Sequence, residues 1–163
     1  MNIMNPTTRY ILRFIFCLLV FRVSANEYNA SFFGIKSNGT TLNTSSIQKA
    51  VNFISEKGGG TLKFYVGRYL TGTIVLKSNV TIHLEEGAVL VGSTNSYDYN
   101  IDTPNCALIY GKGLSNITIK GKGVIDAQGR DLAYHLMDQT HNGIIEDPLD
   151  YDRPRNRRPK GIY

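Results

Sequence analysis

The sequence predicts an all-β solenoid whose first coil is covered by one amphipathic helix. A single helix-period segment comes early, and from residue 61 onward apolar residues recur with a period of two. The strands so indicated are short and are separated by glycine or Ser-Asn turns, with no helix-period stretch between them. In addition, Ser78–Ile82 (SNVTI) returns 37 residues later as Ser115–Ile119 (SNITI), and a repeat of this length is typical of solenoids.

The helix is expected at residues 45–57. Its apolar residues fall at i, i+3, i+4 and i+7 and so share one face; they are Ile47, Ala50, Val51 and Ile54. Ser45 and Gln48 match a capping box, with Thr44 as an alternative cap, and the glycines at 58–60 are expected to end the helix. Because the open end of a solenoid exposes unpaired strand edges, we expect this helix to cover the first coil.

The strands are expected to point alternate apolar side chains into one column. The series so predicted comprises Leu62, Phe64, Val66, Ile74, Leu76, Val80, Ile82, Leu84, Val89 and Val91. Only stacked coils can bury such a column, because one coil cannot bury its own inward side chains. A β-sandwich or barrel with one chance echo would show a similar pattern, so that alternative stays open.

The periodic pattern fades beyond residue 128. Residues 131–137 (DLAYHLM) are a candidate helical turn, and residues 143–158 are polar, basic and punctuated by proline, which indicates a long loop off the coil. Cations crowd the end of the chain: Arg153, Arg155, Arg157, Arg158 and Lys160. They form either a solvated loop or a basic rim that faces a polyanionic substrate, and on the second interpretation they are the candidate substrate-binding residues.

Residues 1–25 match a secretory signal peptide. Arg9 and Arg13 supply a positive start, residues 14–21 (FIFCLLVF) form an apolar run, and Val23–Ala25 offers small residues for cleavage. A membrane anchor is the alternative, but the run is short for a bilayer core of about 30 Å. We therefore expect a domain of residues 26–163 that is secreted to the periplasm or the extracellular space and has no stable membrane association.

The formal net charge of +5 overstates the basic character of that domain. Without Arg9, Arg13 and Arg22 of the leader, 15 basic residues remain against 13 acidic ones, which gives no argument for nucleic-acid binding. Cys17 would leave with the leader, so Cys106 has no disulfide partner and is expected to be a small buried apolar residue.

Several residues could be taken for catalytic or metal-binding groups but have simpler interpretations. Asp126 follows a glycine turn and is expected to cap it. Neighbours such as Glu85 and Glu86 face opposite sides of a strand, so they cannot converge on one bond. Two further sets lack the spacing or the partners of a zinc or calcium site, namely His83, His135 and His141, and Asp147, Asp150 and Asp152. We therefore expect no metal or other cofactor.

Segments between residues 33 and 126, together with Arg158-Pro159, match one known family. They are FGIKSNG (33–39), NTSSIQKA (43–50), GGGTL (58–62), GRYLTGTI (67–74), LKSNVTIHLEEGA (76–88), GS (92–93) and GKGVID (121–126). These segments resemble the N-terminal region of glycoside hydrolase family 28, the polygalacturonases, within the pectate-lyase-like superfamily. Those up to the triple glycine are shared across the superfamily, whereas 76–92 and 121–126 are more particular to family 28.

The resemblance implies a right-handed parallel β-helix that hydrolyses galacturonate-containing pectic polysaccharide with inversion. In the family, the catalytic carboxyls come from an Asn-Thr-Asp segment and an Asp-Asp pair, assisted by Gly-His-Gly and Arg-Ile-Lys. None of these motifs occurs in this sequence, so we assign no catalytic residue. We expect this chain to be truncated at its C-terminus and inactive alone, and the complete protein to be a monomer.

Two other functions remain open on the sequence. One is a non-catalytic module, either a carbohydrate-binding or a structural β-helix. The other is a pectate-lyase-type enzyme on the same fold, which would use calcium and a basic residue.

Overall fold

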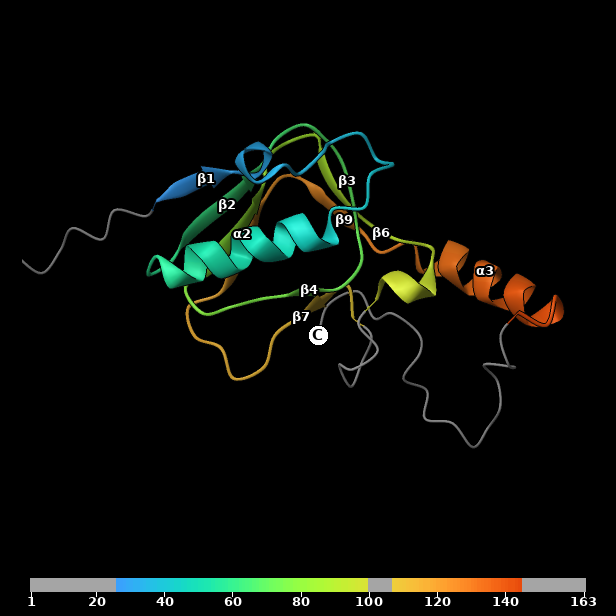
Figure 1. Ribbon diagram of the computed structural model, residues 1–163. Coiled ribbons are helices and arrows are strands. Elements are labelled where there is room, and N and C mark those ends of the chain that lie inside the picture. The colour runs from blue at the N-terminus through green and yellow to red at the C-terminus, as the bar shows by residue number, and fades with distance from the viewer. Residues whose placement is uncertain (1–25, 100–106, 145–163) are drawn as a thin grey trace, which may run out of the picture.

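The computed structural model describes residues 26–99 and 107–144, which form stacked coils of short strands with one helix packed on the first coil (Figure 1). The elements in chain order are β1 (Glu27–Asn29), η1 (Ala30–Phe33), α2 (Thr44–Glu56), β2 (Gly60–Phe64), β3 (Gly67–Thr71), β4 (Ile74–Val75), β5 (Val80–Leu84), β6 (Ala88–Gly92), η2 (Ser96–Asp98), β7 (Ile109–Tyr110), β8 (Thr118–Gly121), β9 (Val124–Asp126) and α3 (Gly129–His141).

The strands of the described residues form three parallel sheets. Sheet A has the order β1-β2-β5-β8, sheet B the order β3-β6-β9, and sheet C pairs β4 with β7. Each full coil contributes one strand to each sheet, so β2, β3 and β4 make the first coil and β5, β6 and β7 the second. The fold is the right-handed parallel β-helix that the resemblance implied, and the parallel pairing excludes the sandwich or barrel alternative.

The sequence repeat corresponds to strands of neighbouring coils. Ile82 of β5 pairs with Ile119 of β8, an offset of 37 residues, whereas Leu62 of β2 pairs with Ile82 at an offset of only 20. The difference arises because residues 93–108 are inserted between β6 and β7, while two residues join β3 to β4. The repeat therefore identified correctly which strands pair between coils, but its 37-residue spacing is not the length of the shorter first coil.

The apolar core is a column of side chains in register between coils. Leu62 stacks on Ile82 in sheet A, and Tyr69 stacks on Leu90 in sheet B. Leu62 and Leu90 are fully buried. Phe64 meets Tyr69 edge to face, with ring centroids 5.0 Å apart, which links the two sheets. The inward column predicted from the alternation is thus present.

Two members of the predicted inward series were wrong. Val66 lies in the turn before β3 and is 74% exposed, because the strand ends at Phe64 and the chain turns there. In β6 it is Leu90 that stacks inward between Tyr69 and Ile125, and Val89 is only partly buried. The register of β6 against β3 sets this phase, and the local alternation of valines does not reveal it.

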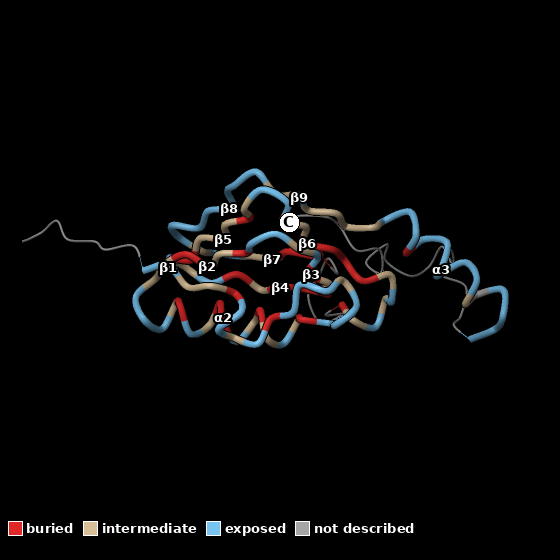
Figure 2. Tube along the Cα trace, turned by 90° about the horizontal axis from the view of Figure 1, so that it is seen from above, coloured by how far each residue is buried: buried red, intermediate tan, exposed pale blue. Residues whose placement is uncertain are grey.

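Helix α2 lies along the first coil and turns its buried face toward the core (Figure 2). Its four expected apolar residues are all fully buried, and the helix contacts β2, β4 and β5. It ends at Glu56, where the N–H of Gly59 donates to the carbonyl of Ile54 at 2.9 Å. A Cβ on Gly59 would lie 2.6 Å from the carbonyl oxygen of Asn79, so the close approach of helix and coil requires glycine at this position.

The Gln48 side chain takes the place of a missing strand beside β4. Its Oε1 accepts from the N–H of Val75, and its Nε2 donates to the carbonyl of Val75, both at 2.9 Å. The predicted capping box is therefore wrong, because Gln48 is used to pair the sheet. Thr44 does not cap the helix either, since its Oγ1 accepts from the N–H of Gly72 at 2.7 Å. The helix N-cap is Asn43, which makes no side-chain capping bond.

Asn43 closes the edge of β3 in the same manner. Its backbone N–H donates to the carbonyl of Leu70 at 2.8 Å, and the residue is only 1% exposed. The side-chain Oδ1 accepts from the N–H of Lys36 at 2.8 Å. The Nδ2 group donates to the carbonyls of Lys36, Thr41 and Leu70 at 3.0, 2.9 and 3.3 Å. One buried amide thus holds the segment before α2 against the first coil.

Helix α3 extends the short helical turn expected at residues 131–137 to Gly129–His141. It projects away from the coils, and of its described side chains only Leu132 is buried (Figures 1 and 2). None of the described helices is long and apolar enough to cross a membrane. The expected signal peptide at 1–25 lies outside the described residues, as does Cys106.

Replacing Asn43 by alanine should lower the free energy of unfolding by about 3 kcal/mol, because four partly buried hydrogen bonds between its side chain and the backbone are lost. Ser45→Ala is the matched control. It lies in the first turn of the same helix and was the expected cap, yet it should change stability by no more than about 0.5 kcal/mol. Urea unfolding of both variants measures this. Equal losses would show that the helix start, and not the coil edge, carries the stability.

Candidate functional site

An ion network lies on the outer face of sheet A. Lys63, His83 and Lys120 are register partners on β2, β5 and β8 and therefore form a column. The Lys63 Nζ lies 3.0 Å from Glu85 Oε1 and 3.4 Å from Glu27 Oε2. His83 Nε2 lies 3.8 Å from the same Glu85 oxygen. The network joins the first two coils through charged groups at their surface.

This pairing excludes Glu85 as a proton donor for catalysis. The hydrogen bond from Lys63 lowers the pKa of Glu85, and the bond to Glu85 in turn raises the pKa of Lys63. A general acid needs the opposite shift, which keeps its proton near neutral pH. Glu86 faces another partner, with its Oε2 3.8 Å from Lys122 Nζ. The two glutamates therefore do not converge, as expected.

The other titratable candidates also have structural roles or no cluster around them. Asp126 Oδ1 accepts from the N–H of Gln128 at 3.1 Å, which is the turn-capping role predicted for it. His83 Nδ1 is buried without a hydrogen-bond partner, and His135 and His141 lie on α3. Within residues 26–99 and 107–144, no three histidine, cysteine or acidic side chains are placed to hold a metal ion.

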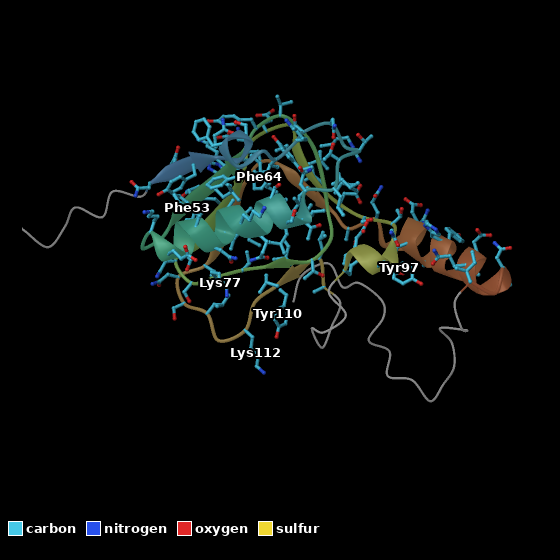
Figure 3. The ribbon with its side chains drawn as sticks, viewed as in Figure 1. Phe53, Phe64, Lys77, Tyr97, Tyr110 and Lys112 are labelled. Carbon is cyan, nitrogen blue, oxygen red and sulfur yellow. The ribbon has the colours of Figure 1, made fainter. Side chains whose placement is uncertain are left out.

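The face of sheet C carries two lysines that the sequence analysis did not single out. Val75 pairs with Tyr110, and the N–H of Leu76 donates to the Tyr110 carbonyl at 2.8 Å, so Lys77 and Lys112 each lie two residues beyond this pair, in the turns that follow β4 and β7. Both are exposed, and neither forms an ion pair within the described part of the chain. Figure 3 shows them on one side of the molecule with Tyr110. We call them the sheet C lysines.

The sheet C lysines suit an anionic polymer better than a single small anion. Strands of neighbouring coils are about 4.8 Å apart, so the stack presents positive charges at successive levels along the solenoid. Same-sign charges along a surface raise the local concentration of a ligand with the opposite charge. Their one detectable signal in the sequence is that a lysine precedes each copy of the Ser-Asn repeat, by one residue at 77 and by three at 112.

The segment after β6 is fixed by a small hydrogen-bonded cluster before the chain reaches sheet C. Ser93 Oγ donates to Asp98 Oδ2 and accepts from the N–H of Asn95 at 3.1 Å. The Tyr99 hydroxyl donates to the carbonyl of Ser93 at 2.7 Å. Gly72 is required beside this cluster, because a Cβ there would lie 1.8 Å from the Asp98 carbonyl oxygen. Burial, with a smaller contribution from Asp98, raises the pKa of Tyr99 to about 12.

Comparisons with known proteins agree with this fold. The chain is 35% identical over 137 residues to an exo-poly-α-D-galacturonosidase from Dickeya chrysanthemi, covering 71% of this chain and 22% of the relative. A crystal structure of a candidate glycosyl hydrolase from Parabacteroides merdae matches with a TM-score of 0.72 and 48% identity, covering 84% of this chain and 57% of that one. No sequence profile of a known family matches the chain.

A third comparison decides the family. The structure of a Family 28 exopolygalacturonase from Yersinia enterocolitica matches with a TM-score of 0.58 and 34% identity, covering 65% of this chain and 21% of that one. The chain belongs to glycoside hydrolase family 28. It spans less than a quarter of the length of the Dickeya and Yersinia proteins.

The remaining candidate residues are the basic ones near the end of the chain and the sheet C lysines. The proposed basic rim lies outside the described residues, so its position relative to sheet C stays a prediction; it comprises Arg153, Arg155, Arg157, Arg158 and Lys160. The described part of this family-28 chain thus offers a cationic face, the sheet C lysines, and no pair of free carboxyls near it.

The raised pKa of Tyr99 makes stability depend on pH in the alkaline range. An exposed tyrosine loses its proton near pH 10, and the folded chain holds that of Tyr99 to about pH 12. The contribution of the neutral Tyr99 hydroxyl to the free energy of unfolding is fully present below about pH 10. About 2 kcal/mol of stability is lost as the pH rises from about 10 to 12. Denaturant unfolding at each pH should show a shallower loss in Tyr99→Phe than in the parent. Tyr97→Phe, at a neighbouring exposed position, should follow the parent, and equal slopes in all three proteins would contradict the assignment.

Proposed function

We propose that this chain forms the N-terminal coils of a secreted, inverting hydrolase of galacturonate-containing pectic polysaccharide. The observation that carries the proposal is family-28 membership on a parallel β-helix. The relatives from Dickeya and Yersinia are both named for galacturonan hydrolysis. A pectic polyuronide is accordingly the substrate class that the proposal assigns to the complete protein.

The catalytic carboxyls would come from coils that this sequence does not contain. Inversion needs a protonated carboxyl and a carboxylate about 6.5–9.5 Å apart, with a water molecule between the carboxylate and the sugar. Among the described acidic residues, Glu85 is paired with Lys63, Glu86 lies beside Lys122, and Asp126 caps a turn. These roles support the expectation that the present chain does not cleave the substrate by itself.

The sheet C lysines are the residues that we assign to substrate binding in these coils. A polyuronide carries one carboxylate on each sugar ring, so cations at successive coils can meet carboxylates on neighbouring rings. Tyr110 of β7 precedes Lys112 by two residues and lies on the same side of the molecule as both lysines. Binding of this kind should weaken as salt rises, because exposed charges are screened.

Polygalacturonate binding tests the assignment. At low salt, the Lys77→Gln/Lys112→Gln variant should bind polygalacturonate about fivefold more weakly than the parent in calorimetry, since exposed charge pairs contribute little each. Lys120→Gln/Lys122→Gln removes the same charge from sheet A and should leave affinity nearly unchanged. Incubation of the chain with polygalacturonate should release no new reducing ends. An absence of binding by the parent, or clear turnover, would contradict the proposal.

Secretion is the remaining part of the proposal and rests on residues 1–25. When the 163-residue chain is expressed in a host with a general secretion pathway, we expect mature protein outside the cytoplasm. Its N-terminus should be Asn26, as determined by mass spectrometry. Recovery of uncleaved chain in the membrane fraction would favour the anchor interpretation instead.

A further inference from the structure

We propose that the outer surface of the N-terminal cap binds anionic polysaccharide, independently of sheet C. The surface, which we call the cap patch, combines two exposed rings (Phe32 and Phe53), two partly buried rings (Tyr28 and Phe33) and two exposed lysines (Lys49 and Lys57). That the ligand is a polyuronide rests on the proposed function. The existence of the surface does not, because it follows from the positions of these side chains.

The aromatic part of the cap patch is a packed group of three rings. Phe53 of α2 meets Tyr28 of β1 edge to face at 5.7 Å between centroids, and it meets Phe33 of η1 at 5.6 Å. Tyr28 and Phe33 are 6.3 Å apart. The rings therefore hold β1, η1 and α2 together, and Figure 3 shows Phe53 on the side of α2 that faces these elements. A rigid group of this kind presents a fixed surface to a ligand.

Part of this aromatic surface is exposed to solvent and is not used to form the core. Phe53 is 39% exposed, and the neighbouring Phe32 is 79% exposed. Single exposed apolar residues are common and need no explanation. Exposed rings that adjoin a packed aromatic group are consistent with a surface that binds a ligand.

The cations of the cap patch lie in line with the exposed ring. Lys49, Phe53 and Lys57 are spaced i, i+4 and i+8, so they follow one another along the solvent face of α2 at intervals of about 6 Å. The Lys57 Nζ lies 5.6 Å from the Phe53 ring centroid. Neither lysine forms an ion pair with a described carboxylate, although Glu56 is exposed on the same helix.

This alternation of cation, ring and cation matches the chemistry of a polyuronide. Each sugar of such a polymer has a face of C–H groups that can lie on an aromatic ring and a carboxylate that can meet a lysine. A neutral glycan would use the rings without the lysines, and an acidic protein segment would use the lysines without the rings. Charge complementarity therefore favours an anionic polysaccharide as the occupant.

Calorimetric titration of the folded chain with polygalacturonate, and with neutral galactan for comparison, tests the cap patch. Lys49→Gln/Lys57→Gln should weaken polygalacturonate binding about fivefold at low salt and leave galactan binding unchanged. Phe32→Ser should weaken binding of polygalacturonate about threefold without altering the melting temperature, because the side chain is mostly exposed. Lys120→Gln/Lys122→Gln again controls for net charge.

The outcomes separate this inference from the proposed function. Weakening by the cap variants in addition to the sheet C variants supports both. If only Lys77→Gln/Lys112→Gln weakens binding, the cap patch is refuted and the proposed function stands. Equal losses of affinity in all three lysine double variants would mean unspecific charge attraction and would refute the cap patch. The cap patch would also be refuted if the parent chain were a dimer that Phe32→Ser dissociates, because the exposed ring would then serve contact between two copies of the chain. A parent that binds no polygalacturonate overturns both.

Discussion

A parallel coil has backbone donors and acceptors along both edges, and in the first coil those on the N-terminal side have no earlier coil to pair with. Left open, such an edge would recruit other strands, and burying it unpaired would cost roughly 1–3 kcal/mol for each group. The chain closes this edge sheet by sheet. Strand β1 pairs with β2, Asn43 with the edge of β3, and Gln48 with that of β4.

The corners between the strands are closed by short side chains from the same helix. Thr44 Oγ1 accepts from the N–H of Gly72, and Ser55 Oγ donates to the carbonyl of Ser78 at 3.1 Å. The polar residues of α2 thus complete the backbone hydrogen bonds of the coil, while its apolar face covers the open end of the core column. Both functions need the helix in one position, and this explains why residues of modest helix propensity occur at its start.

The sequence predicted the elements that depend on local periodicity. Apolar residues at every second position, such as Leu62 and Phe64 or Val80 and Ile82, were sufficient to predict the strands. The SNVTI repeat identified which strands are neighbours. The sequence did not predict that Val66 leaves the core, because β2 ends at Phe64 and the chain turns there. It did not predict that Leu90 enters the core, because the register between coils decides this. The role of Gln48 was missed for a similar reason, since a capping box and a strand substitute have the same local sequence.

The candidate site was less predictable than the fold. The turn-capping role of Asp126 followed from turn chemistry, whereas the pairing of Glu85 with Lys63 was not predicted. The sheet C lysines could not be predicted as neighbours, because Lys77 and Lys112 are 35 residues apart in the sequence and come together only when β4 pairs with β7 in sheet C. The same holds for the cap patch, where Tyr28, Phe33 and Phe53 come from three elements. Surfaces that are built across coils depend on the tertiary register, which no single segment contains.

Hydrogen exchange at the amide of Val75 tests the closure of the first coil most directly. This N–H lies on the outer edge of β4, and its acceptor is the side chain of Gln48. The account predicts slow exchange in the parent chain and exchange at least about tenfold faster in Gln48→Ala, with the amide of Leu90 in the second coil unchanged. Rapid exchange at Val75 in the parent, or no acceleration in the variant, would show that side chains of the helix do not close the edge.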